Sequence, residues 1–162
     1  MEFNVSGLLH DPVGATRRYE LDHEAPIHAG RVLLTRTPDG VLVSAVVDVV
    51  VDASCSRCLA PFGYPLRIEF DEIFVQQVDL MGVRLATPDD PDTFLISTQH
   101  TIDITEAVRQ YSEAAAAMQP LCREECPGIC PVCGQDLSIA VCSCDRTPVD
   151  PRWEALAALR RN

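Results

Sequence analysis

The chain has 162 residues, enough for one domain with its own hydrophobic core, with or without a small appendage. Hydrophobic residues make up 47% of it and charged residues 23%, as in ordinary globular proteins. The formal net charge is −11, with 13 arginines and no lysine, which argues against sequence-independent binding of bare nucleic acid. We expect no secretory signal, because the start has no basic region and no apolar run, and no membrane span. A cytoplasmic location follows as the expectation.

The acidic residues are concentrated at the front of the chain. Residues 1–121 carry 18 acids and 8 arginines, whereas residues 122–162 carry 6 acids and 5 arginines. The acidic front could face a basic protein, and any contact with nucleic acid is expected in the C-terminal segment. Solubility alone is the competing explanation of the acidic surface.

Residues 1–30 show weak apolar alternation and predict one or two strands around a turn at 11–14. From Arg31 the alternation is stronger, and Thr37-Pro-Asp-Gly40 supplies the residues that a hairpin turn needs. The returning strand is expected from Val41 to Ala53. Its odd positions form an unbroken apolar face, which predicts one buried side: Val41, Val43, Ala45, Val47, Val49 and Val51.

The first cysteine pair is expected at the tip of a second hairpin. The predicted strand runs directly into Cys55 and Cys58. After them, apolar alternation resumes at Leu66, Ile68 and Phe70.

The alternation then changes parity to Ile73 and Val75, which predicts a bulge near residues 71–72. Residues 79–93 are polar and end in a proline-rich acidic run, so we expect a mobile acidic loop. Residues 93–97 predict one more short strand.

At Asp103 the apolar period changes from two to about 3.6 residues, which predicts an amphipathic helix that ends before Pro120. Asp103 and Glu106 have the spacing of a capping box. A last helix is expected over 151–160, with Asp150 as its cap. The face of the first helix expected to pack on the sheet comprises Ile104, Ala107, Val108, Tyr111, Ala114, Ala115 and Met118.

These elements together predict an α+β protein. Residues 1–121 are expected to form an antiparallel, barrel-like sheet of at least four strands with one central helix. Residues 122–162 are expected to form a zinc-binding, cysteine-rich segment with a C-terminal helix.

The cysteines carry the clearest chemical signal in the chain. A thiolate is a soft ligand that suits zinc, and two cysteines separated by two residues can bend round one ion. Eight thiols would fill two structural zinc sites of four thiolates each, which leave no open position for catalysis. The predicted ligands are Cys55, Cys58, Cys122, Cys126, Cys130, Cys133, Cys142 and Cys144.

The spacing favours one way of sharing these ligands between two ions. Cys130 and Cys133 can close locally with Cys142 and Cys144, which leaves the other four to clamp the C-terminal segment to the hairpin tip. Pairing of the two Cys-x-x-Cys knuckles with each other, as in zinc ribbons, is the alternative.

Other chemistry ranks below zinc. No thioredoxin-like pattern surrounds Cys55, and none of the ferredoxin spacings is present. Arg57, Arg123 and Arg146 either offset the charge of the thiolates or offer a small cationic surface to RNA. Ordinary surface or core roles are expected for His10, His23, His28 and His100, which lie outside the cysteine clusters.

Four motifs together resemble the bacterial YceD family, which is named for large ribosomal RNA subunit accumulation. They are Cys55-x-Arg57-Cys58-Leu-x-Pro61-Phe62, Ile102-Asp-Ile104, Pro120-Leu-Cys122-x-x-x-Cys126-x-Gly128-x-Cys130-Pro-x-Cys133-Gly134 and Asp150-Pro-Arg152-x-x-x-Leu156-x-x-Leu159. The resemblance covers most of the chain from about residue 30 onward.

The resemblance implies a non-enzymatic factor that supports the processing or accumulation of large-subunit rRNA. Its expected partners are a large-subunit precursor, rRNA or a basic ribosomal protein, with no membrane and no small-molecule substrate. Two alternatives stay open: a redox-responsive zinc regulatory protein, and a thiol oxidoreductase, which would require free thiols in the native protein.

Overall fold

The computed structural model describes residues 1–24, 27–86, 90, 92–145, 152 and 156. The chain forms two compact units. We call Met1–Asp52 with Gly63–Met118 the sheet unit, and Ala53–Phe62 with Gln119–Asn162 the cysteine unit. A boundary between residues 121 and 122 was expected, and the segment with the first cysteine pair groups with the later cysteines.

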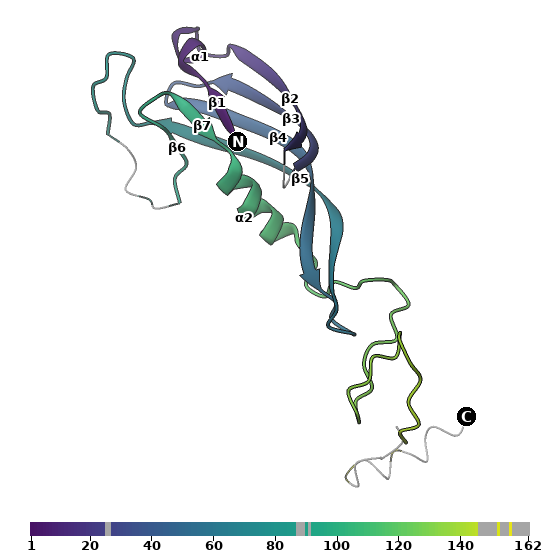
Figure 1. Ribbon diagram of the computed structural model, residues 1–162. Helices are drawn as coiled ribbons and strands as arrows, with labels where there is room; N and C mark the ends of the chain where they lie inside the picture. Colours follow the sequence, from purple (N-terminus) through teal and green to yellow (C-terminus); the bar gives the residue numbers. More distant parts are fainter. Residues whose placement is uncertain (25–26, 87–89, 91, 146–151, 153–155, 157–162) are drawn as a thin grey trace. The chain divides into compact units, whose positions relative to one another are not determined.

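A five-stranded sheet forms most of the sheet unit, with the strand order β2-β3-β4-β5-β6 (Figure 1). The expected hairpin turn is confirmed, since the Thr37 N–H donates to the Gly40 carbonyl at 3.0 Å. A Cβ at Gly40 would lie 2.0 Å from the carbonyl oxygen of Phe74, so only glycine permits this close approach of two strands. The strands are β2 (Thr16–Glu24), β3 (Ile27–Arg36), β4 (Gly40–Ser54), β5 (Pro61–Gln76) and β6 (Leu95–Ile96).

The prediction of a purely antiparallel, barrel-like sheet is wrong in two respects. β6 pairs with β5 in parallel, with Val75 opposite Leu95, because the long connection brings the chain back to run in the same direction. Within the described residues, the end strands β2 and β6 do not pair, so the sheet is open rather than a closed barrel.

A small second sheet joins the two ends of the sheet unit. β1 (Glu2–Asn4) pairs antiparallel with β7 (Thr101–Asp103), with Phe3 opposite Ile102. A helix that the sequence did not predict follows β1, namely α1 (Ser6–His10), and it buries Leu8 and Leu9. Five residues are too few to show a helical period, which explains why the pattern missed it.

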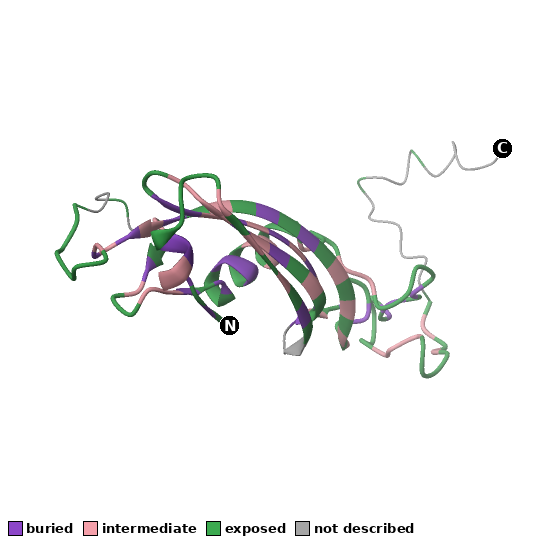
Figure 2. Ribbon diagram, turned by 90° about the horizontal axis from the view of Figure 1, so that it is seen from above, coloured by how far each residue is buried: buried purple, intermediate pink, exposed green. Residues whose placement is uncertain are grey.

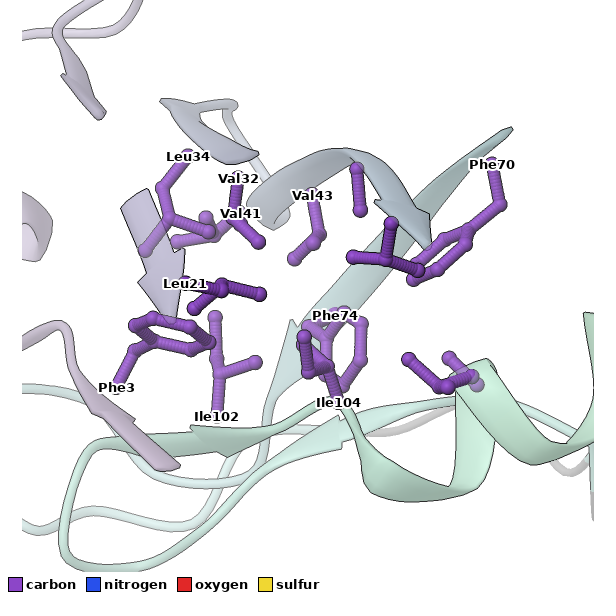
Figure 3. Packing of buried hydrophobic residues seen from close by; sticks show 14 of the residues in the cluster. Phe3, Leu21, Val32, Leu34, Val41, Val43, Phe70, Phe74, Ile102 and Ile104 are labelled. Atoms are coloured by element: carbon purple, nitrogen blue, oxygen red, sulfur yellow. The ribbon is translucent and has the colours of Figure 1, made fainter. Parts of the chain in front are cut away.

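The core lies on one face of the large sheet (Figure 3). The odd positions of β4 from Val41 to Val49 are buried as predicted, and the alternation appears as stripes along the strands in Figure 2. The predicted change of parity in β5 is wrong. Phe70, Phe74 and Gln76 all stay on the buried face, while Ile73 is exposed on the other face.

The second helix, α2 (Thr105–Ala115), packs on this core with its first half only. Ala107 and Val108 are buried, and the Tyr111 ring stacks on Phe70 at 4.9 Å. The predicted packing face is wrong beyond Tyr111, because Ala114, Ala115 and Met118 are exposed. The helix ends where Ala116 takes an extended backbone, and thus before Pro120 as predicted.

The predicted capping box does not form, because the residue at the cap position is Ile104, which makes no side-chain cap hydrogen bond. The Asp103 carboxylate accepts a hydrogen bond from the Thr105 N–H at 2.9 Å, while Glu106 binds Arg109 instead of a backbone group. The predicted helix over 151–160 lies outside the described residues. No helix in the described part of the chain has the length and apolar character to cross a membrane.

Candidate metal centre

The first cysteine pair lies in the turn that joins β4 to β5. The Cys55 N–H donates to the Ala60 carbonyl, and the Leu59 N–H donates to the Cys55 carbonyl, both at 2.9 Å. This turn requires a left-handed backbone at Leu59, whose φ is 62°. We call residues 55–60 the first knuckle.

Residues 130–135 repeat this turn and form the second knuckle. The Cys130 N–H donates to the Gln135 carbonyl at 2.8 Å, and the Gly134 N–H donates to the Cys130 carbonyl at 2.9 Å. Gly134 has φ of 71° and occupies the position of Leu59. Equal hydrogen bonding in both knuckles shows that two different sequences adopt the same cysteine-presenting turn.

The structure gathers all eight predicted ligands into two groups of four sulfurs. The first quartet is Cys55, Cys58, Cys122 and Cys126, and the second quartet is Cys130, Cys133, Cys142 and Cys144. In each group the sulfurs lie within 4.8 Å of one another. This is the grouping that the spacing favoured, and the ribbon-like alternative is not adopted.

The geometry and chemistry of the quartets fit a thiophilic metal ion. A tetrahedral ion with metal–sulfur bonds of about 2.3 Å requires sulfur–sulfur distances of about 3.8 Å. The Sγ atoms of Cys55 and Cys126 are 3.8 Å apart, and those of Cys58 and Cys122 are also 3.8 Å apart. None of the eight cysteines forms a disulfide.

Arg57 holds the segment that carries the other two sulfurs of the first quartet. Its guanidinium donates to the carbonyls of Glu124 at 3.2 Å and Cys126 at 3.0 Å, and its own carbonyl accepts from the Ile129 N–H at 3.1 Å. Gly128 has φ of 74°, and a Cβ there would lie 3.0 Å from the Arg57 carbonyl oxygen. Arg57 therefore positions a ligand loop, a role that the sequence did not reveal.

The two quartets share one stretch of backbone. Cys126 belongs to the first quartet and Cys130 to the second. Between them, Gly128 accepts a hydrogen bond from the Leu137 N–H at 2.9 Å, and Ile129 forms an antiparallel bridge with Asp136. Ordering either quartet therefore restricts a segment that the other one needs.

The thiols differ strongly in acidity within each quartet. Backbone N–H groups of Cys122 and Cys58 lower the pKa of Cys55 to about 6, and those of Cys133 and Val132 do the same for Cys130. Burial and the neighbouring sulfur of Cys126 raise the pKa of Cys122 to about 12. The sulfur of Cys133, followed by burial, raises that of Cys144 to about 12. Crowded sulfurs resist becoming anionic together, so a cation among them would displace the remaining protons.

The other side chains singled out in the sequence stand apart from the quartets. None of the histidines with described side chains joins either sulfur group. Arg123 is exposed and helps to lower the pKa of Asp136, after the larger effect of hydrogen bonds from Ser138. Arg146 lies outside the described residues.

An open sheet joined to two four-cysteine clusters defines a protein with two candidate metal centres and a separate acidic body. The family model for the large ribosomal RNA subunit accumulation protein YceD matches residues 43–160, which include all eight cysteines. The chain belongs to this family, and the resemblance drawn from the motifs is confirmed.

Mycobacterial proteins are among its relatives. Uncharacterized proteins of Mycobacterium tuberculosis (strain ATCC 25618 / H37Rv) and Mycobacterium bovis are each 27% identical over 156 residues, which span 93% of this chain and 72% of the relative. An uncharacterized protein of Mycobacterium leprae is 24% identical over 118 residues, which span 73% of this chain and 52% of the relative. No solved structure matches the chain.

Proposed function

We propose that this protein is a non-enzymatic cytoplasmic factor in large ribosomal subunit biogenesis. It supports the processing or accumulation of large-subunit rRNA by binding a subunit precursor, its rRNA or a basic ribosomal protein. The observation that carries the proposal is the family match over residues 43–160, since that family is linked to accumulation of the large-subunit RNA.

The distribution of charge supports different binding partners for the two units. The sheet unit carries 18 acids and 7 arginines, whereas the cysteine unit carries 6 of each, so the whole formal charge of −11 falls on the sheet unit. Phosphates repel such a surface, and basic proteins are attracted to it. The sheet unit is thus suited to a protein partner, and any rRNA contact falls to the cysteine unit.

Zinc is the metal that we propose for both quartets. When bound, it would hold four thiolates in a closed shell and stabilise the fold of the surrounding loops. The chain's own contribution is the pair of knuckles and the Arg57 contacts, which bring the sulfurs together. A closed shell leaves no site for a substrate, in keeping with a binding role rather than an enzymatic one.

The direct test is sedimentation of the tagged full-length protein from a cell lysate through a density gradient. We expect it to migrate with immature large subunits. Arg123→Glu tests contact between the cysteine unit and rRNA. Arg18→Glu is its charge-matched control, because Arg18 is an exposed arginine of the sheet unit. Arg57→Glu is unsuitable for this purpose, because it would also disrupt the first quartet. Migration at the top of the gradient, free of RNA and ribosomal proteins at low salt, would contradict the proposal.

A second candidate function is redox-responsive zinc regulation. Two ligands, Cys122 and Cys133, are exposed, so an oxidant can reach each quartet. This function predicts zinc release at mild peroxide doses that leave ordinary structural zinc sites intact. Retention of zinc at those doses would eliminate it.

A further inference from the structure

Figure 1 shows the long connection between β5 and β6. This connection carries several exposed apolar side chains. Met81 is 88% exposed and Val83 is 59% exposed, and Leu80 and Leu85 beside them are also exposed. Four large apolar side chains within residues 80–85 are costly to leave in water. Clusters of this kind on a protein surface mark interaction sites.

Hydrogen bonds fold this segment into a hairpin, where a mobile acidic loop was expected. The Asp79 carboxylate accepts hydrogen bonds from the N–H groups of Met81 and Val83, both at 2.8 Å. The Asp79 N–H donates to the Val83 carbonyl at 2.8 Å, and Val78 forms an antiparallel bridge with Arg84. We call residues 77–85 the Met81 hairpin.

Order and exposure together favour a binding element over a loose connection. Gly82 has φ of 81° and allows the tight turn that sets the side chains of Met81 and Val83 outwards. Because its backbone is already fixed, the hairpin would lose little conformational entropy when it binds a partner. Methionine also adapts its shape to an apolar pocket.

The negative charge of the chain near the hairpin in the sequence favours a positively charged partner. Residues 77–92 contain four acids and one arginine, and the rest of the sheet unit is acidic as well. Such a surface is repelled by nucleic acid, by anionic lipid and by a second copy of itself. A basic protein with an apolar pocket provides both complementary features.

We propose that the Met81 hairpin is a docking element that inserts into an apolar pocket, rimmed by cations, on a basic protein. The inference goes beyond the proposed function, because it stands on the hairpin and not on the family. It does not require that the partner be ribosomal.

The test is photo-crosslinking in living cells, with p-benzoylphenylalanine replacing Met81 in the full-length chain. The same replacement at Met118 is the control, since that methionine is 99% exposed in the same unit but stands outside the hairpin. The expected result is an adduct from position 81, absent from position 118, with a basic protein identified by mass spectrometry and linked at an apolar site. Adducts with RNA, phospholipid or a second copy, the same adducts from both positions, or none at all would overturn the inference.

Binding of the identified protein then supplies the quantitative test. Met81→Asp should weaken binding at least about tenfold, because it removes a methionine that the partner's pocket would bury and adds a charge. Met118→Asp should leave binding within about twofold. Equal effects of the two variants would overturn the inference. A basic partner outside the ribosome, together with a wild-type protein that does not migrate with large subunits, would support the hairpin inference and contradict the proposed function. Migration of the wild-type protein with large subunits, together with no adduct from position 81, would do the reverse.

Discussion

Replacing Gly134 by leucine should weaken metal binding at the second quartet without creating a clash. Gly134 has a left-handed φ of 71°, and no heavy atom lies within 4 Å of a Cβ built there. The cost is therefore conformational, about 1–2 kcal/mol for an L-residue in this region. Since metal binding and folding of the knuckle are coupled, the zinc affinity should fall by about 5- to 30-fold.

The first knuckle supplies the reciprocal change. Leu59 occupies the same left-handed position with φ of 62° and is largely exposed, so Leu59→Gly removes strain and little packing. We expect tighter zinc binding at the first quartet, by a few-fold, since the greater freedom of glycine in the unfolded loop offsets part of the gain.

Competition with a chelator of known affinity measures both effects on full-length protein. The control is Gly82→Leu, which imposes the same conformational cost at φ of 81°, with open space around the Cβ, but in the sheet unit. It should leave both zinc affinities unchanged. If Gly134→Leu binds zinc as tightly as wild type while Leu59→Gly gains nothing, the equivalence of the two knuckles is refuted.

Three further predictions concern the protonation of the cysteines and the contacts of Arg57 and Tyr111. Zinc affinity should fall as the pH is lowered from about 8 to about 6, because protons compete with zinc for the cysteine sulfurs. An affinity that does not change with pH would argue against thiolate ligands. Arg57→Ala should weaken zinc binding at the first quartet, because it removes two hydrogen bonds to the ligand loop, whereas Arg123→Ala should not. Equal affinities of the two variants in a chelator titration would contradict this. Tyr111→Phe should lower the free energy of unfolding in urea by about 0.5–1.5 kcal/mol, because it removes a 2.6 Å hydrogen bond to Glu72 and keeps the ring; an unchanged midpoint would show that water replaces the bond fully.

The link between the quartets has a consequence for how the cysteine unit forms. The Ile129 N–H donates to the Arg57 carbonyl in the first knuckle, while Gly128 accepts from the Leu137 N–H and Ile129 bridges to Asp136. Loading of one quartet therefore preorders the other. Positive cooperativity in zinc uptake is the physical expectation.

Local patterns in the sequence determined the parts of this protein in which one face of an element is buried. The odd positions of β4 and the start of α2 are clear because apolar side chains repeat with the period of the element. The eight cysteines and their favoured grouping were also accessible, since short spacings restrict which sulfurs can meet round one ion.

Tertiary structure alone decided the features that depend on distant partners. The parallel pairing of β6 and the exposed second half of α2 depend on which surfaces meet, and Ala114 and Met118 look as apolar in the sequence as the buried Val108. The role of Arg57 arises from carbonyls nearly 70 positions away, with separations of 67 and 69 residues, and the order of the Met81 hairpin arises from hydrogen bonds to one carboxylate. Such contacts leave no periodic trace in the chain, because each involves a single side chain and a backbone group that any residue could provide.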